Sequence, residues 1–128
     1  MSVDTSCATI GRMGRTVLIV DDHEPFRRAA RELLTVEGYE VVGEAGDGAS
    51  AVSEALRLAP AIVLLDIQLP DVDGFEVARR LAAAGHTGAT ILVSGRAAGY
   101  RRRVSESPAV GFIPKGEFTG AALANLLG

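Results

Sequence analysis

Short runs of aliphatic and β-branched residues alternate with longer amphipathic windows from residue 16 to the end of the chain. The apolar runs predict five strands, at residues 16–20, 40–44, 61–66, 90–93 and 111–114. Helical windows of this length between such strands can be closed by right-handed crossovers over a mostly parallel sheet. The pattern therefore predicts a doubly wound α/β fold with helices on both faces of the sheet.

The windows between the strands carry apolar residues at helical spacing. The first predicted helix spans residues 24–37, and Gly38 ends it. Its apolar stripe consists of Phe26, Ala29, Ala30, Leu33 and Leu34. A second stripe, Val52, Ala55, Leu56 and Ala59, ends before Pro60, and a third, Gly74, Val77, Ala78 and Leu81, stops near Gly85.

The last two windows depart from this pattern. Residues 96–107 contain a glycine and few large apolar side chains, so we expect a short or mobile helix there. Residues 117–128 are apolar on more than one side, which predicts self-association through Phe118, Ala122 and Leu126, or burial of the same residues in the core.

Length and charge limit the function classes. A chain of 128 residues with 48% hydrophobic content fits one globular unit, which we place at residues 16–128 after a disordered leader at 1–15. The longest apolar stretch is far below the roughly 20 residues that a membrane span needs. The net charge is −3, and the one basic cluster, at 101–103, does not favour direct nucleic-acid binding. The single Cys7 fits the cytoplasm without establishing it.

Polar residues follow the predicted strands at their carboxyl ends, where open parallel sheets bind ligands. Strand one ends in Asp21 and Asp22, strand three in Asp66, strand four in Ser94, and Lys115 follows strand five. Like charges about 4 Å apart repel by about 4 kcal/mol at an effective dielectric constant near 20, so clustered carboxylates need a cation. An all-oxygen ligand set favours Mg²⁺ and phosphoryl chemistry, with Lys115 as a second positive charge.

Each of these residues also has a structural explanation when it is taken alone. Asp21 or Asp22 could cap the helix that begins near residue 24. Asp71 and Asp73 suggest a calcium loop, but the later ligand positions are missing, so turn and N-cap roles are favoured. His23 has no partner at metal-ligand spacing and is interpreted as a surface residue at a helix start.

Four segments together carry a family resemblance: "LIVDDH", "VLLDIQLPDVDGFEV", "ILVSG" and "GFIPK". From about Thr16 to Leu127 the chain resembles the receiver domain of bacterial two-component response regulators. The resemblance implies a flavodoxin-like sheet with strand order 2-1-3-4-5. "DDHEPFR" and "GFIPK" are most similar to receivers that precede a helix-turn-helix domain, so we expect a stand-alone receiver or an excised fragment.

The resemblance also implies roles for the acidic residues. Asp66 is expected to accept a phosphoryl group from a phosphohistidine on a sensor histidine kinase. Asp21, Asp22, Asp66 and the backbone carbonyl of Gln68 are expected to hold Mg²⁺, with Asp22 in more direct contact and Asp21 acting partly through water. The expected protein is a cytoplasmic phosphoprotein switch rather than a turnover enzyme, apart from catalysing its own phosphorylation and slow dephosphorylation.

The remaining expectations concern the response to phosphorylation. Lys115 is expected to pair with the phosphoryl group and Ser94 to donate a hydrogen bond to it. Phe112 is expected to follow Ser94 as a switch aromatic, or to be a plain core residue. Gly116 stands after the lysine where the family often has a proline, which leaves the isomer of the Lys115–Gly116 bond open.

Two other function classes compete with this interpretation. A receiver fold could act as an interaction module without phosphorylation, as the weak window at 96–107 suggests. A Mg²⁺-dependent phosphatase of the haloacid dehalogenase type would use a second Asp two residues after the nucleophile, where this chain has Gln68. Arg96 could contact the phosphoryl group and alter its lifetime, or it could be a solvated side chain.

Overall fold

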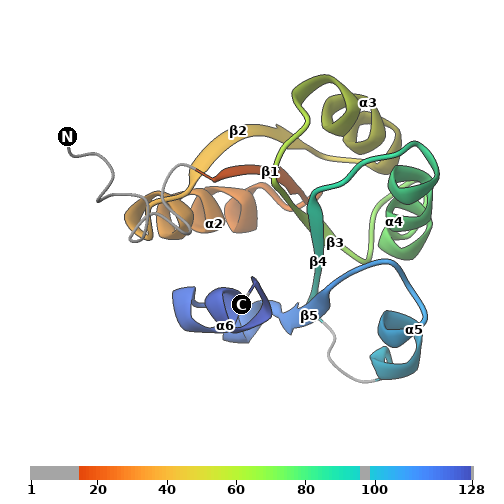
Figure 1. The fold of residues 1–128 in the computed structure, drawn as a ribbon. Coiled ribbons are helices and arrows are strands. Elements are labelled where there is room, and N and C mark those ends of the chain that lie inside the picture. Colours follow the sequence, from red (N-terminus) through yellow and green to blue (C-terminus); the bar gives the residue numbers. More distant parts are fainter. Residues whose placement is uncertain (1–14, 96–98, 128) are drawn as a thin grey trace.

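The computed structural model describes residues 15–95 and 99–127, in which strands and helices alternate (Figure 1). The strands are β1 (Thr16–Val20), β2 (Glu40–Ala45), β3 (Ile62–Asp66), β4 (Ala89–Ser94) and β5 (Gly111–Pro114). The helices are α2 (Glu24–Val36), α3 (Gly48–Leu58), α4 (Gly74–Ala83), α5 (Arg101–Ser105), the 3₁₀ turn η1 (Lys115–Glu117) and α6 (Gly120–Leu127). Residues 1–14 of the predicted leader and Arg96 lie outside the described residues.

The five strands form one parallel sheet in the order β2-β1-β3-β4-β5, which confirms the predicted fold class. Successive side chains of a strand point to opposite faces, so each strand contributes to two core clusters. Leu18, Val63 and Leu92 pack with α3 and α4 on one face, and Val17, Ile62 and Ile91 pack with α2 and α6 on the other. Figure 1 shows α2 and α6 on one side of the sheet and the remaining α-helices on the other.

Side-chain caps and glycines set the ends of the predicted helices. Asp47 accepts a hydrogen bond from the Ser50 N–H (2.7 Å) at the start of α3, and Asp73 accepts one from the Glu76 N–H (2.9 Å) at the start of α4. Gly85, with φ of +87°, follows α4 in the left-handed conformation that glycine adopts without strain. The start of α3 lies earlier than its apolar stripe indicated, because a cap is polar and adds nothing to the stripe.

The last two helices refine the prediction. The helix α5 has five residues, which confirms a short fourth helix. The last helix begins at Gly120 rather than at residue 117, since residues 115–117 form the separate turn η1. The Thr119 hydroxyl accepts a hydrogen bond from the Ala122 N–H (3.0 Å) and so marks the start of α6.

The helix α6 uses its apolar residues largely within the fold. Phe118, Ala122 and Leu126 are half-buried against the core cluster on the α2 side of the sheet. A Cβ atom added at Gly111 of β5 would lie 2.5 Å from a Leu126 methyl carbon, so the helix packs closely on this strand. Core burial therefore accounts for the apolar character of the segment, and self-association through it stays a prediction.

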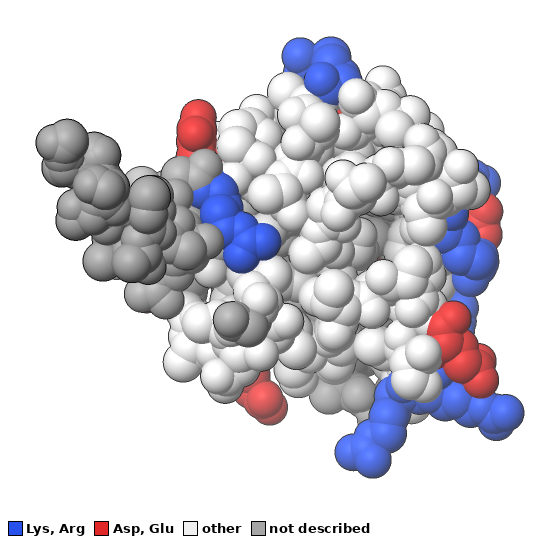
Figure 2. All heavy atoms as spheres, viewed as in Figure 1, with Lys and Arg blue, Asp and Glu red and all other residues white. Residues whose placement is uncertain are grey.

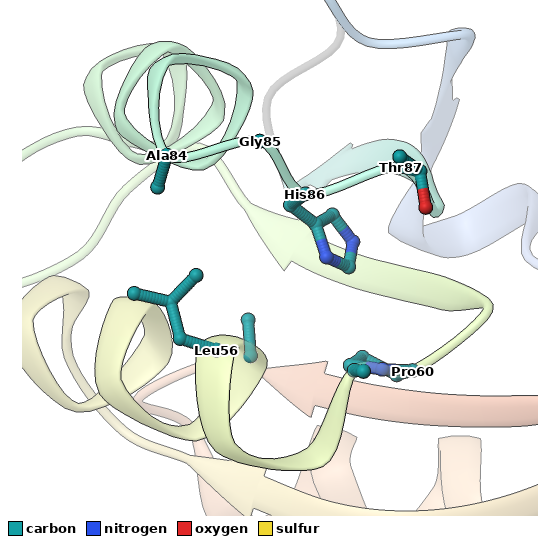
Figure 3. A pocket seen from close by; sticks show the side chains of 8 residues that line it. Leu56, Pro60, Ala84, Gly85, His86 and Thr87 are labelled. Carbon is teal, nitrogen blue, oxygen red and sulfur yellow. The ribbon is translucent and has the colours of Figure 1, made fainter.

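A cavity of about 180 Å³ lies beside the carboxyl-terminal ends of α3 and α4 (Figure 3). The His86 ring lies among the residues that line it, and the His86 Nε2 atom is buried without a hydrogen-bond partner. Burial lowers the pKa of His86, so the ring is neutral near pH 7.

The described helices include none that is both long and apolar enough to cross a membrane.

Candidate functional site

Three carboxylates meet where β1 and β3 end. Val20 pairs with Leu65 in the sheet, so the residues that follow them, Asp21 and Asp66, lie next to each other at the same edge. Asp21, Asp22 and Asp66 each offer an oxygen, and these oxygens lie within 4.8 Å of one another. The structure thus brings together the acidic residues that the strand-end pattern singled out.

Asp21 is fully buried and tightly held. Its N–H donates to the carbonyl of Ala45 on β2 (3.0 Å), and its Oδ1 accepts from the His23 N–H (2.8 Å). The N-cap position of α2 is His23, whose side chain makes no cap hydrogen bond, and Asp22 is exposed. The N-cap explanation for Asp21 and Asp22 is therefore wrong, and His23 is the surface helix-start residue that we predicted.

The Lys115 ammonium enters this acidic cluster from η1. Its Nζ lies 2.6 Å from Asp21 Oδ2 and 3.5 Å from Asp66 Oδ2. In this structure the lysine therefore pairs more closely with Asp21 than with Asp66. The described chain has no cis peptide bond, so the Lys115–Gly116 bond is trans.

The surroundings of Asp66 disfavour its ionised carboxylate, which additional positive charge would stabilise. Burial and then the neighbouring charge of Asp21 raise the pKa of the Asp66 carboxyl to about 6, from an ordinary value of 3.8. The Lys115 ammonium and a hydrogen bond from the Gln68 N–H (3.2 Å) act in the opposite direction without cancelling the rise. One ammonium is thus too little to stabilise ionised Asp66 fully.

The donor set fits a hard divalent cation. The clustered side chains offer only carboxylate oxygens, which Mg²⁺ prefers, and they include no sulfur or imidazole ligand. Gln68 lies directly beside this cluster through its backbone N–H bond to Asp66, while its side chain is exposed. A carbonyl oxygen from the same backbone segment is the kind of neutral ligand that could complete such a site.

Ser94 and Phe112 lie on the two strands beyond Asp66. Ser94 is the last residue of β4 and is fully buried; its neighbour Val93 pairs with Asp66. Phe112 of β5 is half-buried and packs edge-on against the Tyr100 ring, with 6.1 Å between ring centroids. Both explanations of Phe112 stay open, because a half-buried aromatic suits a switch and a core residue alike.

The acidic residues of the "DVDG" segment have structural roles. Asp73 caps α4, and the Asp71 carboxylate accepts hydrogen bonds from the N–H groups of Gly48 (2.7 Å) and Ala49 (3.0 Å) at the start of α3. Hydrogen bonds with these N–H groups keep the pKa of Asp71 below its usual range. The turn and cap roles are confirmed, and both carboxylates are occupied by helix ends rather than arranged as a calcium loop.

Gly74 supports the backbone that carries Asp66. Its N–H donates to the Ile67 carbonyl (2.7 Å), and a Cβ atom added to it would lie 2.5 Å from the Asp66 carbonyl oxygen. A side chain at position 74 would therefore have to displace the backbone of Asp66 and Ile67, which is more rigid than the end of a side chain. The sequence placed Gly74 at a helix start but gave no sign of this approach, which depends on how α4 meets β3.

We expect Gly74→Ala to lower the free energy of unfolding by about 2 kcal/mol, as overpacking against rigid atoms does. Urea unfolding monitored by circular dichroism measures the loss. Gly116→Ala is the matched control and should cost less than about 0.5 kcal/mol, because nothing lies within 4 Å of a Cβ atom there. Equal stability of the two variants would contradict the inferred close approach.

Two further residues beside the site were not singled out by the sequence. The Phe26 ring lies under the Lys115 ammonium, with Nζ 4.7 Å from the ring centroid. The Arg27 guanidinium donates to the Asp21 carbonyl and pairs with Glu44 of β2 (2.9 Å). The sequence identified Phe26 only as part of an apolar stripe, and no local pattern singled out Arg27. Both residues nevertheless follow Asp21 closely in the sequence.

Comparison with known proteins places this site in a family context. A sequence model described as "Response regulator receiver domain" matches residues 17–126. The virulence transcription regulator BvgA of Bordetella pertussis is 39% identical over 106 residues, which is 82% of this chain and 51% of BvgA. The chemotaxis protein CheY of Thermotoga maritima is 41% identical over 69 residues, covering 54% of this chain and 58% of CheY.

Solved structures agree with these sequence matches. The signal receiver domain of the response regulator NarL from Mycobacterium tuberculosis superimposes with a TM-score of 0.79 at 30% identity. The match covers 91% of this chain and 98% of that one. This chain spans about half the length of the transcription regulators that it matches, such as BvgA.

Proposed function

The chain belongs to the response regulator receiver domain family, and on this premise we propose that it is a phosphorylation-dependent switch that accepts a phosphoryl group on Asp66 from a sensor histidine kinase. The observation that carries the proposal is the meeting of three carboxylates with one ammonium at the ends of β1, β3 and β5. Such a cluster suits phosphoryl transfer, which depends on positioning and charge neutralisation. The proposed location is the cytoplasm.

Asp66 acts as the nucleophile in this proposal. With a pKa of about 6, its carboxyl is mostly ionised near pH 7, as an attacking oxygen requires. The new O–P bond forms while the P–N bond of the phosphohistidine breaks, and the bonding electron pair returns to the imidazole nitrogen. Asp21, Asp22, Asp66 and the Gln68 carbonyl would hold Mg²⁺, which would neutralise charge on the phosphoryl oxygens.

The residues around Asp66 would then respond to the added charge. Lys115 exchanges its contact with Asp21 for a phosphoryl oxygen, and the Ser94 hydroxyl donates to a second oxygen. Because Phe112 pairs with Leu92 two residues before Ser94, movement at the end of β4 reaches β5 directly. We propose that the surface of α5, β5 and α6 changes as a result and is recognised by a downstream protein or output domain.

Phosphotransfer followed by intact-mass analysis tests the proposal. The wild-type protein should gain one phosphoryl group from acetyl phosphate with Mg²⁺, and Asp66→Asn should gain none, because an amide is not a nucleophile for this transfer. The matched control is Asp71→Asn, which makes the same change at a carboxylate outside the acidic cluster. Asparagine keeps an oxygen that can accept the hydrogen bond from the Gly48 N–H, so this variant should be phosphorylated as wild type. Modification of Asp66→Asn to the wild-type extent would contradict the proposal.

The same experiment separates the competing functions. A protein that is unchanged in mass and conformation by acetyl phosphate or beryllofluoride with Mg²⁺ would be an interaction module of receiver fold. Steady turnover of a generic phosphate ester would indicate the phosphatase class instead. The exposed amide of Gln68 offers no carboxylic acid for protonating a leaving group, so the geometry favours phosphorylation of Asp66 over turnover of a separate substrate.

A further inference from the structure

An aromatic ring forms one wall of the space around the Lys115 ammonium. The Phe26 ring, in the first turn of α2, has its centroid 4.7 Å from Lys115 Nζ, within the range of a cation–π contact. The ammonium also contacts two carboxylates, Asp21 at 2.6 Å and Asp66 at 3.5 Å. Only 19% of the Lys115 side chain is exposed, so this contact is made in a partly desolvated setting.

The ring is fixed by its own packing. Phe26 is half-buried against the core cluster on this face, and the Phe118 ring packs against it with 5.9 Å between centroids at an angle of 58°. Phe118 follows η1, and its N–H donates to the Lys115 carbonyl (3.3 Å). The backbone of Lys115 and the ring beneath its ammonium are therefore connected through a compact aromatic pair.

A ring face attracts an ammonium through its quadrupole and offers no lone-pair acceptor for a conventional hydrogen bond. Lysine has three N–H donors and no acceptor. With an aromatic ring on one side, the Lys115 ammonium is attracted there without a lone-pair acceptor, so its hydrogen bonds can go to oxygens at the sheet edge. A water or a carboxylate in place of the ring would bind one of those donors and would have to be displaced when the ammonium moves between oxygens.

We propose that Phe26 is a positioning residue for phosphoryl transfer, holding the Lys115 ammonium beside Asp66 while leaving its N–H groups free to turn from Asp21 to the incoming phosphoryl oxygens. The inference rests on the proposed function. Phe26 acts through Lys115, and it lies in the first turn of α2, the helix that follows Asp21 and Asp22, so the ring links the lysine to the loop that carries the acidic residues.

Three variants test this role. Phe26→Leu keeps apolar volume but removes the ring face, Phe26→Tyr keeps the face, and Phe118→Leu makes the same change in the neighbouring ring. At saturating Mg²⁺ we expect the rate constant for phosphorylation by acetyl phosphate to fall about three- to tenfold in Phe26→Leu. It should stay within about twofold of wild type in Phe26→Tyr and Phe118→Leu, and the Mg²⁺ dissociation constant should change less than about twofold throughout.

A structural readout keeps the test independent of activity. Ring-current shifts of the Lys115 side-chain protons should be present in wild type and Phe118→Leu and absent in Phe26→Leu. An unchanged rate in Phe26→Leu, an equal rate loss in Phe118→Leu, or the lack of a ring-current shift in wild type would overturn the inference. If wild-type Asp66 accepts no phosphoryl group, the proposed function fails, and the role of Phe26 in transfer fails with it, while the shift still reports the contact.

Discussion

Asp66→Asn is expected to raise the free energy of unfolding of the metal-free protein by about 3 kcal/mol at pH 8. Burial and the charge of Asp21 raise the pKa of Asp66 to about 6, so the folded protein disfavours the ionised carboxylate. Each unit of such a shift corresponds to about 1.4 kcal/mol. A neutral amide removes this penalty, and urea unfolding in EDTA measures the gain.

The pH dependence of the gain has a definite sign. Between pH 3.8 and about 6 the folded state of wild type binds more protons at Asp66 than the unfolded chain does, so its stability falls as the pH rises through this window. Asp66→Asn lacks this fall, and the two proteins should converge below about pH 4. Excess Mg²⁺ should stabilise wild type preferentially, because a ligand of the folded state adds stability by mass action.

Asp47→Asn is the matched control for this change. Asp47 caps α3 through a hydrogen bond from the Ser50 N–H, and asparagine caps helices about as well as aspartate. Its unfolding free energy should lie within about 0.5 kcal/mol of wild type at pH 8. If Asp66→Asn were no more stable than wild type in EDTA at pH 8, burial and the charge of Asp21 would not destabilise ionised Asp66 in the folded protein.

The two residues at the centre of this prediction were identifiable from sequence because strand ends are local features. A run of buried apolar residues that stops at Asp21 or Asp66 fixes the position of the carboxylate along its strand, and a parallel sheet collects such ends at one edge. The sheet itself follows from the same runs, since strands buried on both faces need helices on both sides. The fold and the acidic cluster were therefore predictable together.

The contacts that tune the site were not predictable in this way. The approach of Gly74 to the Asp66 backbone and the hydrogen bonds of Asp71 with the first N–H groups of α3 join segments whose relative placement depends on the packing of α3 and α4. The closer pairing of Lys115 with Asp21 depends on side-chain rotamers. Sequence spacing does not determine side-chain rotamers or the distances between the helices and the sheet. The sequence could therefore predict which edge of the sheet holds the functional residues, but not which side chains contact each other there.

Lys115→Met is expected to lower the free energy of unfolding in EDTA at pH 8 by about 3 kcal/mol. The ammonium is paired with Asp21 Oδ2, which is buried, and removing one partner of a buried pair leaves the other charge uncompensated. Lys115 also lowers the pKa of Asp66, so its loss moves that pKa further above 6. Protonation at lower pH then relieves the repulsion, and the loss should be smaller at pH 5 than at pH 8.

The control for this loss is an exposed ion pair on the same side of the fold. Arg28 pairs with Glu24 at 3.1 Å with 65% of each side chain exposed, so Arg28→Met should cost less than about 1 kcal/mol. Millimolar Mg²⁺ should restore part of the stability of Lys115→Met, since a divalent cation can compensate the same carboxylates. Wild-type stability of Lys115→Met at pH 8 without Mg²⁺ would show that Asp21 and Asp66 do not depend on the ammonium, and the electrostatic basis of the site would have to be abandoned.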